Sequence, residues 1–144
     1  MRLTSFTDYG LRTLMRLAGE PGRVFTTTEL AAELSISRNH LTKVVAELRA
    51  AGFIATRRGA RGGFRLAAPA GEIRIGQVVR HLEGRHALVE CYDAGGGACV
   101  LTPACRLKGL LGRADAAFVA ELDRSTLADC AIVPPQRGRS GPAR

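Results

Sequence analysis

Two helices joined by a three-residue turn are predicted by the stretch TTTELAAELSISRNHLTKVVAELRA, residues 26–50. It begins with a Thr-x-x-Glu capping box, a pattern that typically opens a helix. Ser35-Ile36-Ser37 forms the turn, and Ser37 can cap the second helix. Apolar residues then recur at helical spacing, at Leu41, Val44, Val45 and Leu48. The pattern predicts a helix–turn–helix over about residues 28–51, whose second helix would enter the major groove of DNA.

The outward face of the second helix carries side chains suited to reading DNA. Arg can pair with guanine and Asn with adenine, while Lys and Thr can hold phosphates. His40 is ambiguous, because it fits a DNA contact and a packed surface histidine equally well. A solvated amphipathic helix is the alternative for the whole face. The predicted DNA contacts in this motif are Thr28, Ser37, Arg38, Asn39, His40, Thr42 and Lys43.

A basic β-hairpin is predicted directly after the motif, over residues 53–66. Two strand-like segments, 53–58 and 63–66, flank the loop Gly59-Ala60-Arg61-Gly62. As the wing of a winged helix, it would place Arg61 in a minor groove and Arg57 and Arg58 on phosphates. The hairpin could also complete the core through Phe53, Ile54 and Leu66, and the two roles are compatible. The predicted fold class is therefore mainly α with a small β-hairpin wing.

Charge and length agree with a DNA-binding domain. The 144 residues carry a formal net charge of +8, and the segment 38–65 holds seven Lys and Arg residues against one Glu. Such a concentration suggests a polyanionic partner. No apolar run is long enough to span a bilayer, and no signal-peptide core follows Met1. We expect a cytoplasmic protein with no membrane partner, one regulator domain over residues 1–132 and a disordered basic tail over residues 133–144.

Three further helices are predicted outside the motif. Residues 4–18 predict a first helix, whose core face contains Leu11, Leu14, Met15 and Ala18, and Ile75, Val78, Val79 and Leu82 indicate a short amphipathic one. The longest pattern covers about residues 103–123. A small head does not bury so long a stripe, so we predict a dimerisation helix; a helix of the intramolecular core is the alternative. A two-fold dimer would match a palindromic operator.

Three of the four cysteines lie in one loop, residues 91–105. They are Cys91, Cys99 and Cys105, and the segment 101–104 predicts a helix start that puts Cys105 in the first turn, where a thiolate is favoured. Gaps of seven and five residues differ from the close pairs of structural zinc sites, and thiolates suit iron–sulfur clusters. We predict an iron–sulfur cluster; zinc, a disulfide or no cofactor are the alternatives. Cys130 stands apart and is expected to be a small buried residue.

Five stretches together resemble the NsrR nitric-oxide-sensing repressors, a branch of the winged-helix regulators that also includes IscR. They are LTSFTDYGLRTL, SRNHLTKVV, RGGFRL, IRIGQVVRHLE and LTPACRLKGLL, distributed up to about residue 130. The last stretch, together with the spacing C-x7-C-x5-C, is the most specific part. The basic tail and Cys130 lie outside the resemblance.

The resemblance implies a homodimeric transcriptional repressor that is not an enzyme and carries one iron–sulfur cluster per subunit. Cys91, Cys99 and Cys105 match the ligand cysteines of the family. Asp8 of the partner subunit is implied as the fourth ligand of a [4Fe–4S] cluster, whereas Asp8 by its residue type alone reads as a first-turn carboxylate favoured by the helix dipole. A carboxylate is a poorer match for cluster iron than a thiolate and exchanges more easily. Nitric oxide is the implied signal for release from DNA.

Three other interpretations stay open at this point. One is a redox or iron–sulfur-status regulator with a [2Fe–2S] cluster, as in IscR-like relatives. The others are an iron–sulfur enzyme or electron carrier, and a DNA-binding module stabilised by zinc.

Overall fold

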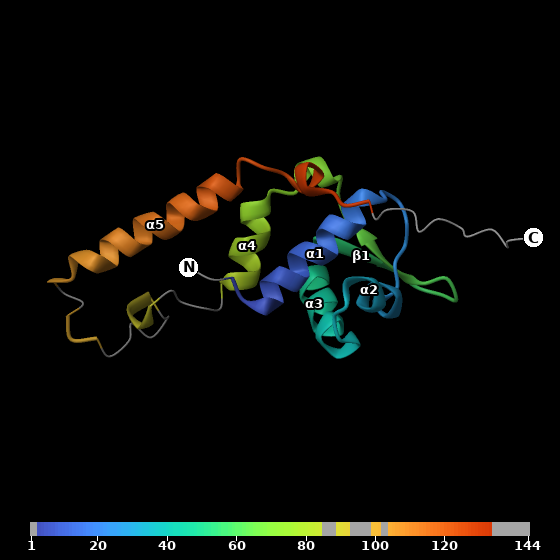
Figure 1. Ribbon diagram of the computed structural model, residues 1–144, viewed down its shortest axis with the longest axis horizontal. Helices are drawn as coiled ribbons and strands as arrows, with labels where there is room; N and C mark the ends of the chain where they lie inside the picture. Colours follow the sequence, from blue (N-terminus) through green and yellow to red (C-terminus); the bar gives the residue numbers. More distant parts are fainter. Residues whose placement is uncertain (1–2, 85–88, 93–98, 102–103, 134–144) are drawn as a thin grey trace, which may run out of the picture.

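Helix α1, Ser5–Gly19, runs through the middle of the head in this computed structural model, which describes residues 3–84, 89–92, 99–101 and 104–133 (Figure 1). It begins where the Thr4 hydroxyl accepts a hydrogen bond from the backbone N–H of Thr7, at 3.2 Å. It packs against the helix–turn–helix, the second strand of the wing and segments that follow the wing. Leu14 and Leu17 are fully packed there, while Leu11 and Met15 lie at the edge of the core.

The helix–turn–helix consists of α2, Thr27–Leu34, and α3, Arg38–Ala50. Ser35 adopts a left-handed conformation, with φ of 56°, and this turns the chain so that Ile36 enters the core. Thr26 caps α2 by accepting a hydrogen bond from the Glu29 N–H at 3.1 Å. The predicted capping box is only half formed, because the Glu29 carboxylate pairs with Arg23 instead.

The wing is an antiparallel hairpin of β1, Ile54–Arg57, and β2, Gly63–Leu66, in which Ile54 lies opposite Leu66. Phe25 extends it, because its backbone exchanges hydrogen bonds of 2.9 and 2.8 Å with that of Phe64. A Cβ on Gly63 would lie 2.3 Å from the Phe25 carbonyl oxygen, so this approach requires glycine. Phe53 and Ile54 are buried and Leu66 packs against the core partly buried, so the wing also completes the core as predicted; Phe64, which was not predicted, is buried as well.

Helix α4, Ile75–Glu83, follows the short 3-10 turn η1, Ala70–Glu72, and packs against α1. The predicted amphipathic stripe is confirmed, since its four apolar residues are all buried. The hydroxyl and the N–H of Thr4 both donate to Oε1 of Glu83, at 2.8 Å each, which fixes the end of α4 beside the start of α1.

Helix α5, Arg106–Leu122, projects from the head, with the 3-10 turn η2, Glu90–Tyr92, near its outer end (Figure 1). The chain then returns through the 3-10 turn η4, Leu127–Cys130, and Ile132 donates a backbone hydrogen bond to Met15 at 3.0 Å. Cys130 is half-buried against the core, close to the expectation for it. Together these elements form a winged helix with a projecting helix, which confirms the predicted fold class; the predicted tail from residue 134 on lies outside the described residues.

Among the helices that the structure describes, none combines the length and the apolar character needed to cross a membrane.

Candidate nucleic-acid interface and metal centre

The start of α3 presents uncommitted polar side chains to solvent. Arg38, Asn39 and Lys43 are exposed, and within the described parts of the chain their side chains make no hydrogen bond or ion pair. Thr28, in the first turn of α2, is also exposed. Burial of Leu41, Val44 and Leu48 on the opposite side of α3 holds this face outward. The exposed face of α3 could therefore enter the major groove of DNA with little rearrangement of the protein.

Three other predicted DNA contacts are exposed but already have local partners. The Ser37 hydroxyl caps α3 by accepting from the His40 N–H at 3.2 Å, and the Thr42 hydroxyl donates to the Arg38 carbonyl at 2.8 Å. The His40 ring is stacked with Tyr9 of α1, so the second of its two predicted roles, that of a packed surface histidine, is supported. Each of these side chains can still accept or donate one further bond.

The wing supplies three exposed cations. Arg57 ends β1, while Arg58 and Arg61 lie in the loop between the strands. None of the three has an ion-pair partner in the regions that the structure covers, so their charges remain available for phosphates. The loop is tightened by a backbone hydrogen bond of 2.8 Å from Gly62 to Gly59. The hairpin extends outward from the head beside α2 (Figure 1).

The three clustered cysteines lie at the outer end of α5 and in the loop before it. Cys91, Cys99 and Cys105 are free thiols of intermediate exposure. The predicted helix start is corrected, because α5 begins at Arg106 and Cys105 is its N-cap residue. Cys105 is nonetheless directly beside the N-terminal end of the helix. Within the predicted helix start at residues 101–104, Thr102, a possible cap, and Pro103, which suits the first helical position, lie outside the described residues.

A contact between Tyr92 and α5 joins the segment that carries Cys91 to this helix. The Tyr92 hydroxyl donates a hydrogen bond to the Lys108 carbonyl, and Lys108 Nζ lies 5.6 Å from the centroid of the Tyr92 ring. A Cβ on Gly112 would approach the Tyr92 hydroxyl oxygen to 2.9 Å, so glycine keeps this position open. No pattern in the sequence indicates this contact.

Three cysteine sulfurs are a suitable donor set for an iron–sulfur group. Among the described residues, no three His, Cys, Asp or Glu side chains gather closely enough to hold a metal ion. Asp8 lies in the first turn of α1, where its carboxylate forms an ion pair with Arg12 at 2.9 Å. The Asp8 side chain is 44% exposed and therefore accessible to another molecule.

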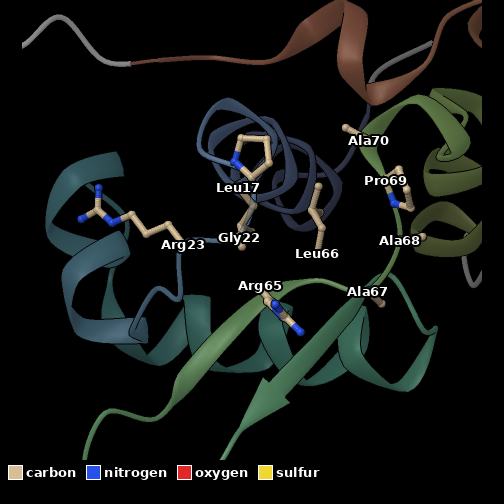
Figure 2. A pocket seen from close by; sticks show the side chains of 10 residues that line it. Leu17, Gly22, Arg23, Arg65, Leu66, Ala67, Ala68, Pro69 and Ala70 are labelled. Atoms are coloured by element: carbon tan, nitrogen blue, oxygen red, sulfur yellow. The ribbon is translucent and has the colours of Figure 1, made fainter.

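One cavity of about 300 Å³ lies beside the end of α1, between the turn at residues 21–23 and the segment 65–70 (Figure 2). Small and apolar residues form most of its lining, together with Arg23 and Arg65. It contains none of the predicted DNA contacts or cluster ligands.

Comparison with known proteins agrees with this architecture. The family model for Rrf2, described as an iron-dependent transcriptional regulator, matches residues 3–131. The crystal structure of Staphylococcus aureus CymR is 30% identical, covering 92% of this chain and 99% of that chain, with a TM-score of 0.69. CymR (YrzC) of B. subtilis, described as its global cysteine regulator, is 28% identical over 91% and 96% of the two chains, with a TM-score of 0.70.

T. potens IscR is 26% identical over 90% of this chain and 85% of that chain, with a TM-score of 0.69. The family match covers the head, the cysteine loop and α5 together. The protein is accordingly a transcription regulator and not an enzyme, and the chain belongs to the Rrf2 family of iron-dependent transcriptional regulators.

Proposed function

We propose that this protein is a homodimeric repressor that binds palindromic operator DNA and senses nitric oxide through a [4Fe–4S] cluster, one per subunit. The observation that supports the proposal is the set of three free, partly exposed thiols before α5 and at its N-cap, together with the hydrogen bond that ties Tyr92, next to Cys91, to α5. An iron–sulfur sensor needs its cofactor within reach of small molecules, and a buried cysteine set would not provide this.

Cys91, Cys99 and Cys105 would supply three thiolate ligands, and the partner subunit's Asp8 would supply the fourth. The cluster, when bound, would provide an iron with one weakly held oxygen ligand, where nitric oxide can react. Within one chain, Asp8 pairs with Arg12, whose side chain is 51% exposed. Exposed pairs contribute at most about 1 kcal/mol, so Asp8 can leave Arg12 for a cluster ligand role at little cost.

The outer half of α5 supports the dimer. Leu107 and Leu110 are 58% and 53% exposed, whereas Phe118 and Leu122, nearer the head, pack against the core. The dimerisation interpretation of this helix therefore fits its outer half, and the core interpretation fits its inner half. An unpartnered apolar stripe on the outer half favours burial against a second subunit. That arrangement would present two copies of α3 to a two-fold symmetric operator.

Helix α1 supplies the connection between the two functions. Asp8 and Tyr9 are neighbours near its start, and Tyr9 stacks with His40 of the reading helix. A ligand bond from Asp8 would hold α1 in one position relative to the partner. Loss of that bond on exposure to nitric oxide would free α1, shift α3 and release the operator.

Anaerobic purification followed by nitric oxide titration tests the proposal. Iron and sulfide content, absorption and operator binding are measured on the same sample, for wild type and for Asp8→Ala. We expect wild-type protein to carry about four irons per subunit and to release DNA as the cluster absorption is lost. Colourless anaerobic protein without iron or sulfide would refute a cluster, and an Asp8→Ala protein with wild-type nitric oxide response would refute the Asp8 relay.

A [2Fe–2S] regulator of redox or iron–sulfur status is the second candidate, and the likeness to T. potens IscR favours it. Native mass spectrometry of the anaerobic protein separates the two cluster types, because they differ by two irons and two sulfides. A nitric oxide response would then be replaced by a response to oxidation or to cluster occupancy.

A further inference from the structure

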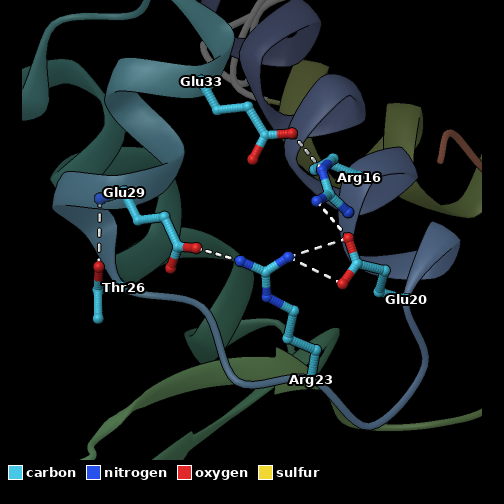
Figure 3. A network of polar contacts seen from close by, with 6 residues as sticks. All are labelled: Arg16, Glu20, Arg23, Thr26, Glu29 and Glu33. Atoms are coloured by element: carbon cyan, nitrogen blue, oxygen red, sulfur yellow. Dashed lines mark hydrogen bonds and ion pairs between the residues drawn. The ribbon is translucent and has the colours of Figure 1, made fainter. Parts of the chain in front are cut away.

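A chain of ion pairs joins α1, the turn after it and α2. Arg16 donates from Nε to Glu33 on α2 and from Nη2 to Glu20, at 2.5 Å. Arg23 in turn donates to both oxygens of Glu20, at 3.0 and 2.8 Å, and pairs with Glu29 on α2 (Figure 3). These five residues are here named the Arg16 network.

Arg16 is the buried member of the Arg16 network. Its side chain is 3% exposed, and an unpaired charge at such a position would be strongly unfavourable. Burial acts to lower the pKa of Arg16, but hydrogen bonds with Glu33 and Glu20 outweigh it and keep this pKa above its usual value. Its guanidinium carbon also lies 4.8 Å from the Phe25 ring centroid, at the base of the wing. Arg16 is therefore held charged and in a fixed position.

The Arg16–Glu33 pair connects the two parts of the molecule that the proposed function requires to move together. Arg16 lies eight residues after Asp8 on α1, about 12 Å along the helix axis. Glu33 lies in the last turn of α2, directly before the turn that leads into α3. The pair is therefore a direct polar link between α1 and the helix–turn–helix.

We infer that Arg16 is a positioning residue that, through Glu33, transmits the state of the cluster to the helix–turn–helix. This inference rests on the proposed function. If it holds, the Arg16–Glu33 pair contributes to the difference in operator affinity between cluster-loaded and cluster-free protein. The affinity ratio is the operator affinity of the cluster-loaded protein divided by that of the cluster-free protein. If the pair served stability alone, its removal would change both affinities equally and leave the affinity ratio unchanged.

Glu33→Gln is the test variant, because the amide oxygen can still accept from Arg16 Nε while the ion pair is lost. Glu29→Gln is the matched control on the same helix, since Glu29 pairs with Arg23 in the turn and not with Arg16 on α1. Operator dissociation constants are measured anaerobically for cluster-loaded and cluster-free dimers of each variant, together with thermal unfolding. We expect Glu33→Gln to reduce the affinity ratio about three- to tenfold, and Glu29→Gln to leave it near the wild-type value.

A wild-type ratio above one that Glu33→Gln leaves unchanged would overturn the inference and spare the proposed function. A wild-type ratio of one would instead refute the proposed function itself. Should Glu33→Gln not fold, the paired variant Arg16→Met with Glu33→Leu replaces it, because an apolar pair of similar size often preserves stability. A reduced ratio in the paired variant supports the inference, and a wild-type ratio in that variant overturns it.

Discussion

The ring of Tyr9 on α1 is stacked with the ring of His40 on α3, with centroids 6.3 Å apart and planes inclined by 30°. His40 is the third residue of the reading helix, and Tyr9 directly follows Asp8. The contact therefore joins the residue next to the proposed cluster ligand to the predicted DNA-reading surface. It also explains why an exposed histidine in the predicted DNA face need not touch DNA.

Tyr9→Leu should weaken operator binding by cluster-loaded protein, because a stacked ring pair contributes about 0.5–1.5 kcal/mol, roughly a threefold to tenfold change in affinity. Tyr9→Phe keeps the ring and should behave as wild type. Anaerobic fluorescence anisotropy with labelled operator measures both. Equal affinity of Tyr9→Leu and wild type would show that the stack does not hold α3.

Periodicity in the sequence was sufficient to predict α4 and the pairing of α2 with α3, since each helix has apolar residues at helical spacing along one face. Periodicity did not predict that Phe25 joins the wing, because a single residue bridging to Phe64 leaves no repeating pattern. It also missed Arg16, which a rule that places cations on the surface cannot find without knowing its two carboxylate partners.

The candidate metal site could also be predicted only in part from the sequence. The cysteine spacing is a local property, so it predicts Cys91, Cys99 and Cys105 as ligands, and these stay predictions. The ligand role of Asp8 was implied only by the family resemblance, because a ligand from a second subunit leaves no spacing pattern within one chain. The start of α5 was misplaced by three residues, because a capping threonine and a proline favoured an earlier start than the chain adopts.

Substitutions in α3 and in the wing should have different signatures in DNA binding. Asn39→Ala should cost about 1–3 kcal/mol on the operator and relax sequence preference, because Asn reads a base edge. Arg58→Ala should weaken operator and random DNA alike and lower the slope of log affinity against log salt by about one. Dissociation constants over a salt series on both DNAs distinguish them. If Arg58→Ala weakened binding to the operator but not to random DNA, Arg58 would not be a phosphate contact.

Gly112→Ala should weaken cluster retention although alanine alone would stabilise a helix by about 1 kcal/mol. The added Cβ would lie 2.9 Å from the Tyr92 hydroxyl oxygen and push the Cys91 segment away from α5. In a Tyr92→Phe background the next ring atom is at 3.7 Å, so Gly112→Ala should have no additional effect there. Iron per subunit after anaerobic reconstitution measures both changes.

Gly109→Ala is the matched control for Gly112→Ala, because among the described residues its added Cβ would meet only the Arg113 side chain, at 3.5 Å. It should retain the cluster as wild type does. A similar loss in Gly109→Ala would show that helix composition, and not the Tyr92 contact, controls retention.

Acid should destabilise the head partly through Glu20. Hydrogen bonds from Arg23 and then Arg16 hold the pKa of Glu20 below its usual value. A depressed pKa in the folded state means that this stabilisation is complete above the unfolded pKa of about 4.3 and is lost as pH falls through the folded pKa. Urea unfolding of cluster-free protein at pH 7 and near pH 3 should show a smaller acid loss in Glu20→Gln than in wild type. Glu121→Gln, which removes only an exposed pair with Arg124, should lose as much as wild type.

Leu110→Asp should dissociate the proposed dimer while leaving the head folded. Leu110 lies on the outer half of α5 and is 53% exposed, so within one chain a charge there meets mostly water. At a subunit interface the same carboxylate would be desolvated, which is strongly unfavourable without a partner. Sedimentation equilibrium should therefore show a monomer, and thermal unfolding a head of near wild-type stability. Because each cluster would take its fourth ligand from the other subunit, the monomer should also fail to retain a [4Fe–4S] cluster. A dimeric Leu110→Asp protein would place the interface elsewhere, and a monomer with a full cluster would exclude the partner subunit's Asp8 as a ligand.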